Sequence, residues 1–436
     1  MVTPYHQNNI KNTQRALIFF VTWSVVLITK IEAQPIPNDF FQFKSQKLLY
    51  DAGENWETLT LFGPVRFQHV NARQKLSADS LYIKARAGAY SKNNGVAVYG
   101  FGHFTYQKYF FGYLYPRIVN EVNTFQRYSG IPRDISRGGF NSGETDLSGI
   151  GFQNNWITLQ IGRGRESWGA GNNIQLALSE ESPAYDYAML GSDYGNLRVN
   201  YIHGFLESTA EGINRYITAR GMEWTNKKSL IIGLSETVIY SGLNRPLDLG
   251  YMNPISSHLE IELNNRLNIV VPPGVPSSAN GVWQISLDWL IKDQLRFSGN
   301  YLIDEFVIDP EIEIGKEHGR AYSVRAAYTH MRNKNSIFTN YVSFVYVGTP
   351  TFRHGDGTNN FVQRGRPLGW QQGSDGWEMT LGLNYFNRSN LIVTMEAGKL
   401  EQGEESITAR FFDPFADYLK GNFPSGIVNE TLFING

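Results

Sequence analysis

The sequence has no cysteine, so neither disulfides nor cysteine-ligated metals can hold this fold together. Its eight histidines never stand three to five residues apart, the ligand spacing of zinc motifs; they lie at positions 6, 69, 103, 203, 258, 318, 330 and 354. The 39 basic and 40 acidic residues nearly cancel, so there is no basic field to attract nucleic acid. We therefore expect no metal ion, no cofactor and no nucleic-acid partner.

Long apolar runs are also scarce, and the mean hydropathy of -0.32 excludes a bundle of membrane-spanning helices. The one continuous run, Ala16 to Ile28, follows Lys11 and Arg15 and is too short to span a bilayer as a helix. A basic start, a short apolar stretch and a small residue after it are typical of an export signal. We predict that residues 1–33 are a signal peptide, cleaved after Ala33.

The chain after the signal divides into two parts. Residues 34–57 are polar and mixed, which predicts a periplasmic lead-in or a short helix around Phe41 to Leu49. From about residue 58, runs of alternating apolar and polar residues recur, with Gly, Asn, Asp and Pro between them. Such alternation is typical of strands with one apolar and one polar face, as in the runs 81–90, 157–162, 283–291, 377–385 and 391–398.

Runs of this kind begin near eighteen positions, each about as long as a tilted membrane-spanning strand needs: 58, 79, 95, 109, 145, 156, 173, 195, 213, 229, 259, 281, 294, 319, 336, 361, 376 and 391. A soluble sandwich would also alternate, but the export signal, the number of strands and tryptophans at strand ends (Trp156, Trp224, Trp283 and Trp377) favour a membrane. In lipid, strands must close on themselves to satisfy their backbone hydrogen bonds. The sequence therefore predicts an all-β fold, a closed antiparallel transmembrane β-barrel of about 18 strands over residues 58–436, in the outer membrane of a Gram-negative-type cell.

Charged residues occupy the polar faces of these strands. If the apolar faces point to lipid, the lumen receives equal numbers of both signs: Lys84, Arg86, Arg198, Arg296 and Arg325 against Glu260, Glu262, Asp288, Glu378 and Glu396. Opposed long side chains fit an occluded barrel braced by ion pairs as well as an open pore. We favour bracing over a role in ion selectivity.

The most distinctive stretch is Asn155 to Ser179, a strand, a glycine- and arginine-rich turn from Gly162 to Gly171, and a second strand. The turn lacks the Lys-Ser/Thr ending of a phosphate loop and leads into a strand instead of a helix. The loop from His354 to Asn360 misses the closing acidic residue of a calcium loop. There is also no G-x-S-x-G elbow, and a barrel enzyme would need a Ser/His/acid cluster at one rim. We predict that the protein is not an enzyme.

Binding is the chemistry that remains for the glycine-rich turn. Trp168 offers a flat ring, and Arg163 and Arg165 offer planar guanidinium groups, which are suited to contact a sugar or an acidic polysaccharide. In the alternative interpretation, Trp168 packs at the barrel rim or in the lumen, and the glycines only let the backbone turn. The sequence leaves both open, and we favour packing.

Several segments resemble a known family. The segment Trp168 to Ser179, WGAGNNIQLALS, resembles the Trp-Gly-x-Gly and Leu-x-Leu-Ser segment of the outer-membrane capsule-assembly family called Wzi. Further matches follow in the same order at 249–254, 283–288, 301–306, 366–370 and 373–375. The family-motif positions, which we interpret as barrel structure, are Trp168, Gly169, Gly171, Ser179, Tyr251, Asn253, Pro254, Asp304, Gly369, Gly373 and Asp375.

The resemblance implies an eighteen-stranded outer-membrane barrel that acts, without catalysis, as a lectin for capsular polysaccharide and helps to hold the capsule on the cell. Its expected partners are capsular or other surface polysaccharide and outer-membrane lipids, and it would be a monomer. The family can carry a small helical element on the periplasmic side, although residues 34–107 show little match. The closing strand is either the run that contains Phe433 or the run 406–412. A diffusion porin for small solutes is the alternative function.

Overall fold

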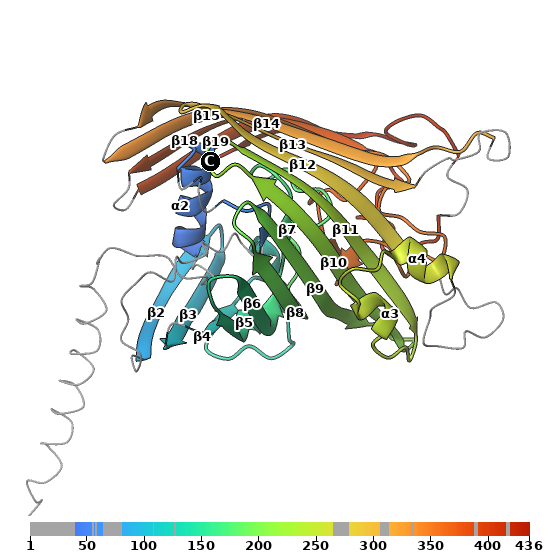
Figure 1. The fold of residues 1–436 in the computed structure, drawn as a ribbon, viewed down its shortest axis with the longest axis horizontal. Helices are drawn as coiled ribbons and strands as arrows, with labels where there is room; N and C mark the ends of the chain where they lie inside the picture. The colour runs from blue at the N-terminus through green and yellow to red at the C-terminus, as the bar shows by residue number, and fades with distance from the viewer. Residues whose placement is uncertain are drawn as a thin grey trace, which may run out of the picture.

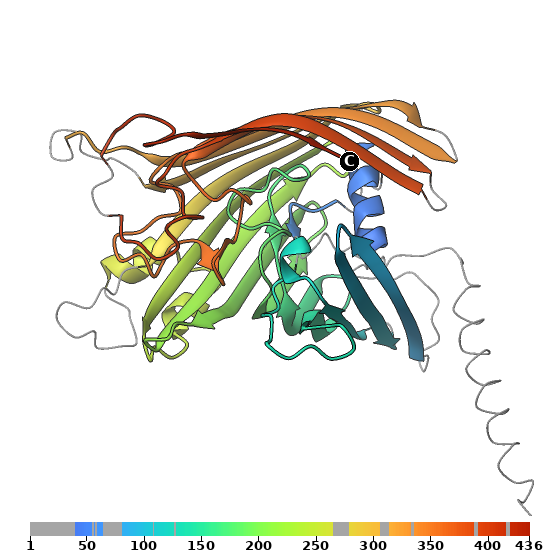
Figure 2. The ribbon, with the colours of Figure 1, turned by 180° about the vertical axis from the view of Figure 1, so that it is seen from behind.

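The computed structural model describes residues 40–54, 56, 59–63, 81–107, 109–125, 128–264, 279–305, 314–332, 335–387, 391–415 and 419–436. Sixteen antiparallel strands within these ranges form one sheet, which we call the wall. Each wall strand pairs with the wall strand that precedes or follows it in the sequence. The sheet curls around a lumen (Figures 1 and 2). The prediction of an all-β antiparallel barrel is confirmed. The predicted signal peptide, residues 1–33, lies outside the described residues.

Each wall strand is formed by one run of alternating residues. The wall strands are β2 (Leu81–Lys92), β3 (Gly95–Tyr106), β4 (Phe110–Val119), β5 (Ser142–Gln153), β6 (Ile157–Gly164), β8 (Tyr185–Asp193), β9 (Leu197–Ser208), β10 (Ile213–Thr225), β11 (Leu230–Leu243), β12 (Asn280–Lys292), β13 (Leu295–Glu305), β14 (Gly319–Arg332), β15 (Ser336–Val347), β18 (Gly376–Asn387), β19 (Leu391–Gln402) and β20 (Asn429–Asn435). The short strands β1 (Phe62–Gly63), β7 (Ser167–Trp168), β16 (Val362–Gln363) and β17 (Arg366–Pro367) lie outside this sheet. The helices are α2 (Phe40–Asp51), α3 (Leu249–Met252), α4 (His258–Leu263) and the 3-10 turn η2 (Val122–Thr124).

The sequence predicts about eighteen strands, and the described wall has sixteen. Three of the predicted runs, near residues 58, 173 and 361, lie outside the wall: β1 pairs with β7, Leu178 forms a bridge with Trp168, and β16 pairs with β17. A fourth run, near residue 259, is helix α4. Two wall strands, β8 and β20, are not among the eighteen counted runs. Because β20 contains Phe433, the first of the two alternatives for the last strand is correct, and the run 406–412 is not a strand.

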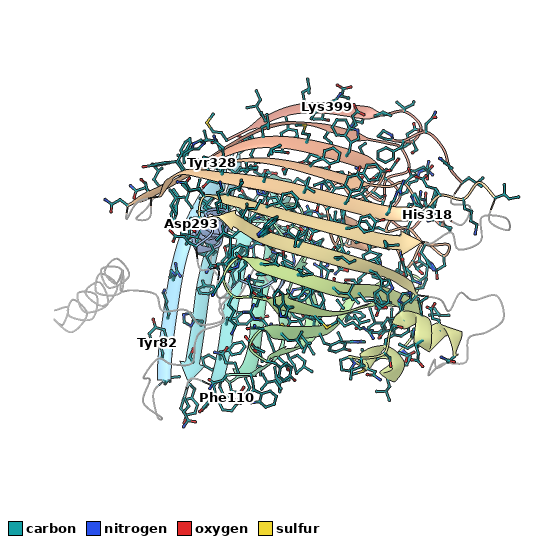
Figure 3. The ribbon with its side chains drawn as sticks, turned by 45° about the horizontal axis from the view of Figure 1, so that its top comes forward. Tyr82, Phe110, Asp293, His318, Tyr328 and Lys399 are labelled. Carbon is teal, nitrogen blue, oxygen red and sulfur yellow. The ribbon has the colours of Figure 1, made fainter. Side chains whose placement is uncertain are left out.

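The strand faces point as the alternation predicts. On β12, Ile285 is exposed on the outer face, whereas Gln284 and Ser286 are buried. On β6, Ile161 is exposed and Gln160 is buried. Figure 3 shows outward side chains along the length of the strands. An apolar outer face of this kind is what a barrel presents to lipid.

The two ends of the barrel differ in the length of their connections. At one end every turn has two to four residues, as between β12 and β13 around Asp293. At the other end six connections are long: 120–141, 165–184, 244–279, 306–318, 348–375 and 403–428. Asp293 and His318, which mark these ends, lie on opposite sides in Figure 3. In outer-membrane barrels the short turns are periplasmic and the long loops extracellular.

The lumen is filled by chain that leaves the wall. Residues 59–63, the connection 165–184, and parts of 348–375 and 403–411 pack against inward wall residues in one apolar core. Helix α2 stands between β2 and β19 in both views of the ribbon (Figures 1 and 2), where the sequence allowed a short helix. Among the described residues no helix has the length and hydropathy of a membrane span.

Candidate functional site

A plug, defined as residues 165–184, crosses the lumen directly after β6 ends. Its backbone turns at Gly169 and Gly171, whose φ angles are +125° and +78°. A side chain at Gly169 would also collide with the wall, because a Cβ atom there would lie 2.8 Å from Asn300 Oδ1. These two glycines are therefore required by backbone conformation and by close approach to the wall.

Inward polar residues of the wall hold the plug by its backbone. Asn300 on β13 accepts a hydrogen bond from the N–H of Ala170 (2.7 Å) and donates to the carbonyl oxygens of Ala170 (3.0 Å) and Ile174 (3.3 Å). Ser323 on β14 donates to the same Ile174 oxygen (2.6 Å). Buried backbone groups need such partners, so these two wall side chains replace the sheet hydrogen bonds that the plug lacks.

Trp168 anchors the start of the plug against the short strand β1. It is 1% exposed and its ring packs on Phe62, with centroids 4.7 Å apart, where β7 pairs with β1. Its indole N–H donates to Glu166 Oε2 (2.9 Å). Burial raises the pKa of Glu166 to about 7, and the hydrogen bond from Trp168 opposes this shift. Glu166 is therefore partly protonated near neutral pH.

A second connection, residues 348–375, meets the plug inside the barrel. The N–H of Trp370 donates to Leu176 O (3.0 Å), and the N–H of Ser179 donates to Leu368 O (2.9 Å). Gly369 lies between these two bonds, with no space for a side chain against the plug backbone. Two family-motif segments, 168–179 and 366–370, thus form one unit of the lumen filling.

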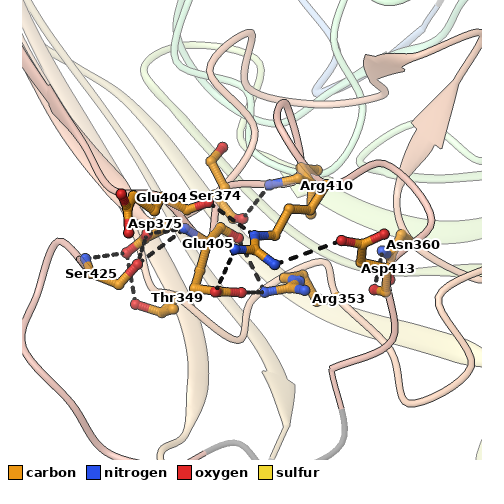
Figure 4. Close-up of polar contacts among 12 residues, drawn as sticks. Thr349, Arg353, Asn360, Ser374, Asp375, Glu404, Glu405, Arg410, Asp413 and Ser425 are labelled. Carbon is orange, nitrogen blue, oxygen red and sulfur yellow. Dashed lines mark hydrogen bonds and ion pairs between the residues drawn. The ribbon is translucent and has the colours of Figure 1, made fainter. Parts of the chain in front are cut away.

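Asp375 joins the loops at the long-loop end, as Figure 4 shows. Its buried carboxylate accepts hydrogen bonds from the hydroxyls of Thr349 (2.8 Å) and Ser425, and from the N–H groups of Ser425 (3.0 Å) and Glu405 (3.1 Å). Nearby, Arg353 forms an ion pair with Glu405. Asp375 therefore links the connection 348–375 to the connection 403–428.

Helix α2 is fixed in the lumen by two ion pairs. Asp51 pairs with Arg325 of β14 (2.7 Å), and both side chains are buried. Lys47 pairs with Glu180 of the plug, and Ser167 donates to the same carboxylate (2.7 Å). Although burial alone would raise it, the Lys47 ammonium holds the pKa of Glu180 at about 2.

The bracing of the lumen by ion pairs is present, with one correction. Arg296 pairs with Asp288, and Arg198 pairs with Glu223 (2.9 Å), all buried inside the barrel. Glu260 and Glu262 were placed in the lumen on the assumption of a strand, and this was wrong, because they belong to helix α4. The run HLEIEL alternates like a strand, but Ser257 caps it as a helix by accepting from the N–H of Glu260.

Two adjoining cavities lie beside the plug. One, of about 370 Å³, lies between the plug and strands β18 to β20, and is lined by Asn173, Gln371, Asn435, Glu378, Trp370 and Phe433 among others. The other, of about 490 Å³, lies between α2, β2 and β19. Both are lined by Asn173, Glu181 and Glu396, so they meet there. We name the pair the polar cavity and take it as the candidate site.

The three residues with candidate glycan contacts lie apart from the polar cavity. Arg165 and Trp168 are buried, and Arg165 pairs with Asp146, so neither side chain reaches solvent in this conformation. Arg163 is partly exposed and pairs with Asp186 on the neighbouring strand β8 (3.1 Å). These positions agree with the second interpretation from the sequence, in which Trp168 packs in the lumen and does not contact a ligand.

The remaining family-motif positions have varied surroundings. Asp304 accepts from the N–H of Phe352, and Gly373 has a φ angle of +80°. Tyr251, Asn253 and Pro254 belong to the connection 244–279, where Tyr251 is buried and Pro254 is exposed. They do not line the polar cavity.

The sequence analysis placed two residues of the polar cavity, Glu378 and Glu396, in the lumen, but it missed the amides that line the cavity. Asn173 comes from the plug, Gln371 from the connection 348–375 and Asn435 from the last strand. In the sequence these residues share only an amide side chain that lies in or next to a family-motif segment, or in the closing strand. This pattern indicates a binding site only when it is known that the plug packs against those segments.

Comparisons with known proteins concern the fold. No family model matches the chain, and no curated protein matches it. Among solved structures, it is similar to Wzi, an outer membrane protein involved in group 1 capsule assembly in Escherichia coli and described as a carbohydrate-binding β-barrel: the TM-score is 0.55 at 13% identity, over 85% of this chain and 86% of that one. An anion-selective porin from Comamonas acidovorans (TM-score 0.39, 7% identity, 74% and 89% covered) and OmpF of Salmonella typhi in complex with daunomycin (0.40, 6%, 77% and 94%) also match. The likeness to Wzi that the ordered motifs indicated is therefore confirmed as a likeness of fold, and the chain has the architecture of an outer-membrane β-barrel.

Proposed function

We propose that this barrel binds capsular or another surface polysaccharide at the outer membrane and helps to attach it to the cell, without catalysis. The observation that carries the proposal is the polar cavity beside a filled lumen. The resemblance in fold to a carbohydrate-binding barrel supports the same substrate class. An N-terminal export signal would bring the chain to the outer membrane, where it would act as a monomer among outer-membrane lipids.

The cavity has the chemistry that sugars require. The amides of Asn173, Gln371 and Asn435 each offer a donor and an acceptor to ring hydroxyls, and the carboxylate of Glu378 accepts from them. The rings of Trp370 and Phe433 offer apolar surface to the C–H faces of a sugar ring. A combination of a few polar groups with aromatic walls is typical of small-ligand sites, and here it fits a neutral or weakly charged saccharide unit.

The filled lumen supports binding over diffusion. The plug, helix α2 and residues 59–63 pack with the wall in one core. Buried ion pairs, such as that between Asp288 and Arg296, join neighbouring strands inside the barrel. A diffusion porin would need a continuous water path past this core. In a planar bilayer we expect no steady open-channel current from the purified protein, and a steady current would favour the porin instead.

Cells provide the test of the biological role. Deleting the protein should shift surface polysaccharide from the cell-bound to the shed fraction, and a copy with intact cavity residues should restore it. An unchanged ratio of cell-bound to shed polysaccharide after deletion would contradict the proposal. An equal amount of total polysaccharide in both strains would place the effect on attachment rather than synthesis.

A further inference from the structure

Residues 244–264, the first part of the connection between β11 and β12, lie on the outer surface of the barrel. We call residues 245–264 the outer flap; it contains α3 and α4, which lie beside β9 to β12 in Figure 1. The wall residues Ile217 and Ile239 belong to the lumen core, so their strand neighbours Thr218 and Tyr240 face outward. Those outward residues contact the flap, which places the flap on the outer side of the wall.

The flap is attached through the polar groups of this outer face. Three successive flap carbonyls accept hydrogen bonds from wall side chains: Tyr251 O from Thr218 (3.4 Å), Met252 O from Tyr201 (2.9 Å) and Asn253 O from Arg220 (3.1 Å). The ring of Tyr251 stacks on that of Tyr240 with centroids 4.4 Å apart. Tyr216, Val238, Ile261 and Ala279 complete a small core that is separate from the lumen.

Two charges lie under the flap on the lipid side of the wall. Arg220 of β10 pairs with Glu236 of β11 (3.1 Å), and these residues face one another in the register of the two strands. His258 of the flap contacts the same carboxylate through Nδ1 (2.8 Å). Charged side chains that face hydrocarbon are costly unless they are paired with one another and shielded from lipid. Here the two charges pair with each other, and the flap adds the contact from His258 and covers them.

The bare apolar face of β10 is too short to span a membrane. From the short-turn end it exposes Trp224 and Met222 and then reaches Arg220. Four residues of a strand tilted by about 40° cover about 10 Å of depth, whereas the apolar band of such barrels is about 25 Å tall. Something apolar has to cover the rest of this face.

The outer side of the flap is apolar. Among the side chains of the flap that the structure describes, five large apolar ones are exposed, with Ile255 at 89%; they are Leu247, Leu249, Met252, Ile255 and Leu259. The cation at the start of the flap, Arg245, does not join this exposed surface, because it is buried and pairs with Asp248 (3.1 Å). The exposed apolar surface of the flap therefore continues that of Met222 and Leu234, which lie on the wall nearer the short-turn end.

We propose that the outer flap lies in the hydrocarbon region of the membrane, in the half nearer the long loops, and that lipid acyl chains cover its exposed apolar side chains. It covers the outer face of β10 and β11 above Arg220 and Glu236 and presents its own apolar side chains to lipid there. The flap then sets the depth of the barrel on this side.

Because the chain has no cysteine, single spin labels can test this placement directly. The variants are Ile255→Cys and Leu249→Cys on the flap, with Ile285→Cys on the lipid-facing side of β12 and Ile135→Cys in the connection 120–141 as references; all four positions are exposed. Each labelled barrel is placed in phosphatidylethanolamine–phosphatidylglycerol vesicles, and collisions with oxygen and with a water-soluble nickel complex are compared.

We expect both flap labels to favour oxygen over nickel, as the label at 285 does, while the label at 135 favours nickel. Flap labels that behave like the one at 135 would overturn the proposal. Flap labels that collide with neither reagent would overturn it too, since they would show that protein, such as a second copy of the chain, covers the flap.

Discussion

A Cβ atom on Gly369 would lie 1.6 Å from the carbonyl oxygen of Leu176. These residues come from two connections that are almost 200 residues apart in the sequence, and their contact lies inside the barrel. The hydrogen bonds on either side, Trp370 to Leu176 and Ser179 to Leu368, hold the two backbones at this separation. The filling of the lumen therefore depends on a glycine at position 369.

Gly369→Ala should loosen the plug, because the added methyl group cannot fit without moving one backbone away from the other. Overpacking of this kind costs about 1–3 kcal/mol. The measurement is the unfolding temperature of the barrel in detergent, with Gly355→Ala as the control, since a Cβ at Gly355 meets no atom within 4 Å. Equal unfolding temperatures for the two variants would show that the contact is not constrained.

Asn300→Ala should release the plug from the wall. It removes the partner of the N–H and of the carbonyl group of Ala170, whereas the carbonyl oxygen of Ile174 keeps its hydrogen bond from Ser323. Each buried group left without a partner costs about 1–3 kcal/mol. We expect current fluctuations in a planar bilayer that the wild-type barrel lacks. Asn340→Ala, at an exposed position of β15, is the control and should stay silent. A silent Asn300→Ala barrel would mean that other contacts suffice to hold the plug.

Stability should depend on pH through Glu166. Because the pKa is about 7 in the folded protein and 4.5 is its ordinary value, the folded state binds the proton more tightly. The contribution of Glu166 to stability is therefore fully present below pH 4.5, is lost as the pH rises through 7 and is absent above it. Glu166→Gln should remove this slope and stabilise the barrel at pH 8 by up to about 3 kcal/mol. Denaturant titrations at pH 5 and pH 8 measure it.

The matched control for that titration is Glu121→Gln, at an exposed position in the connection 120–141. It should leave the difference in unfolding free energy between the two pH values as it is in the wild type. The interpretation fails if Glu166→Gln retains the wild-type difference, because another group would then be responsible for it.

Leu287→Arg should destabilise folding into bilayers, since Leu287 lies on the outer face of β12 between Ile285 and Trp289. An arginine on the lipid face costs about 2–4 kcal/mol near the midplane and little at the interface. Gln294→Arg, in the turn after β12, is the control. Folding efficiency in lipid vesicles should fall for the first variant only, and equal efficiencies would argue that this face is not in lipid.

The strand pattern predicted fourteen of the sixteen wall strands, because a strand with lipid on one side and lumen on the other keeps a strict period of two, as Ile285 and Ser286 show. The same period misled where chain folds inward. Ile174, Leu176 and Leu178 alternate like a wall strand, yet all three are buried in the plug. Short-range alternation cannot separate a wall strand from an extended segment that is packed on both sides.

The candidate site depended on long-range packing that the sequence does not encode locally. Trp168 and Arg165 are residue types suited to contact a sugar, but both side chains are buried in the plug. The cavity residues Asn173, Gln371 and Asn435 are ordinary amides in three distant segments. Gly369 lets the connection that carries Gln371 approach the plug, and pairing of β20 with β19 places Asn435 beside them. The recognisable motif therefore marks the scaffold, and the neighbouring amides form the surface that a ligand can reach.

Titration of the purified barrel with surface polysaccharide from its own cells is the most direct test of polysaccharide binding in the polar cavity. The double variant Gln371→Ala/Asn435→Ala removes two exposed cavity amides, and Asn196→Ala removes an exposed amide from the turn after β8. Loss of two hydrogen bonds at about 0.5–1.5 kcal/mol each, or about 1–3 kcal/mol together, should weaken binding by about 5- to 150-fold. We predict binding by the wild type and by Asn196→Ala, and this weakening in the double variant. No binding by the wild type would contradict the proposed function, and equal binding by all three would contradict the site.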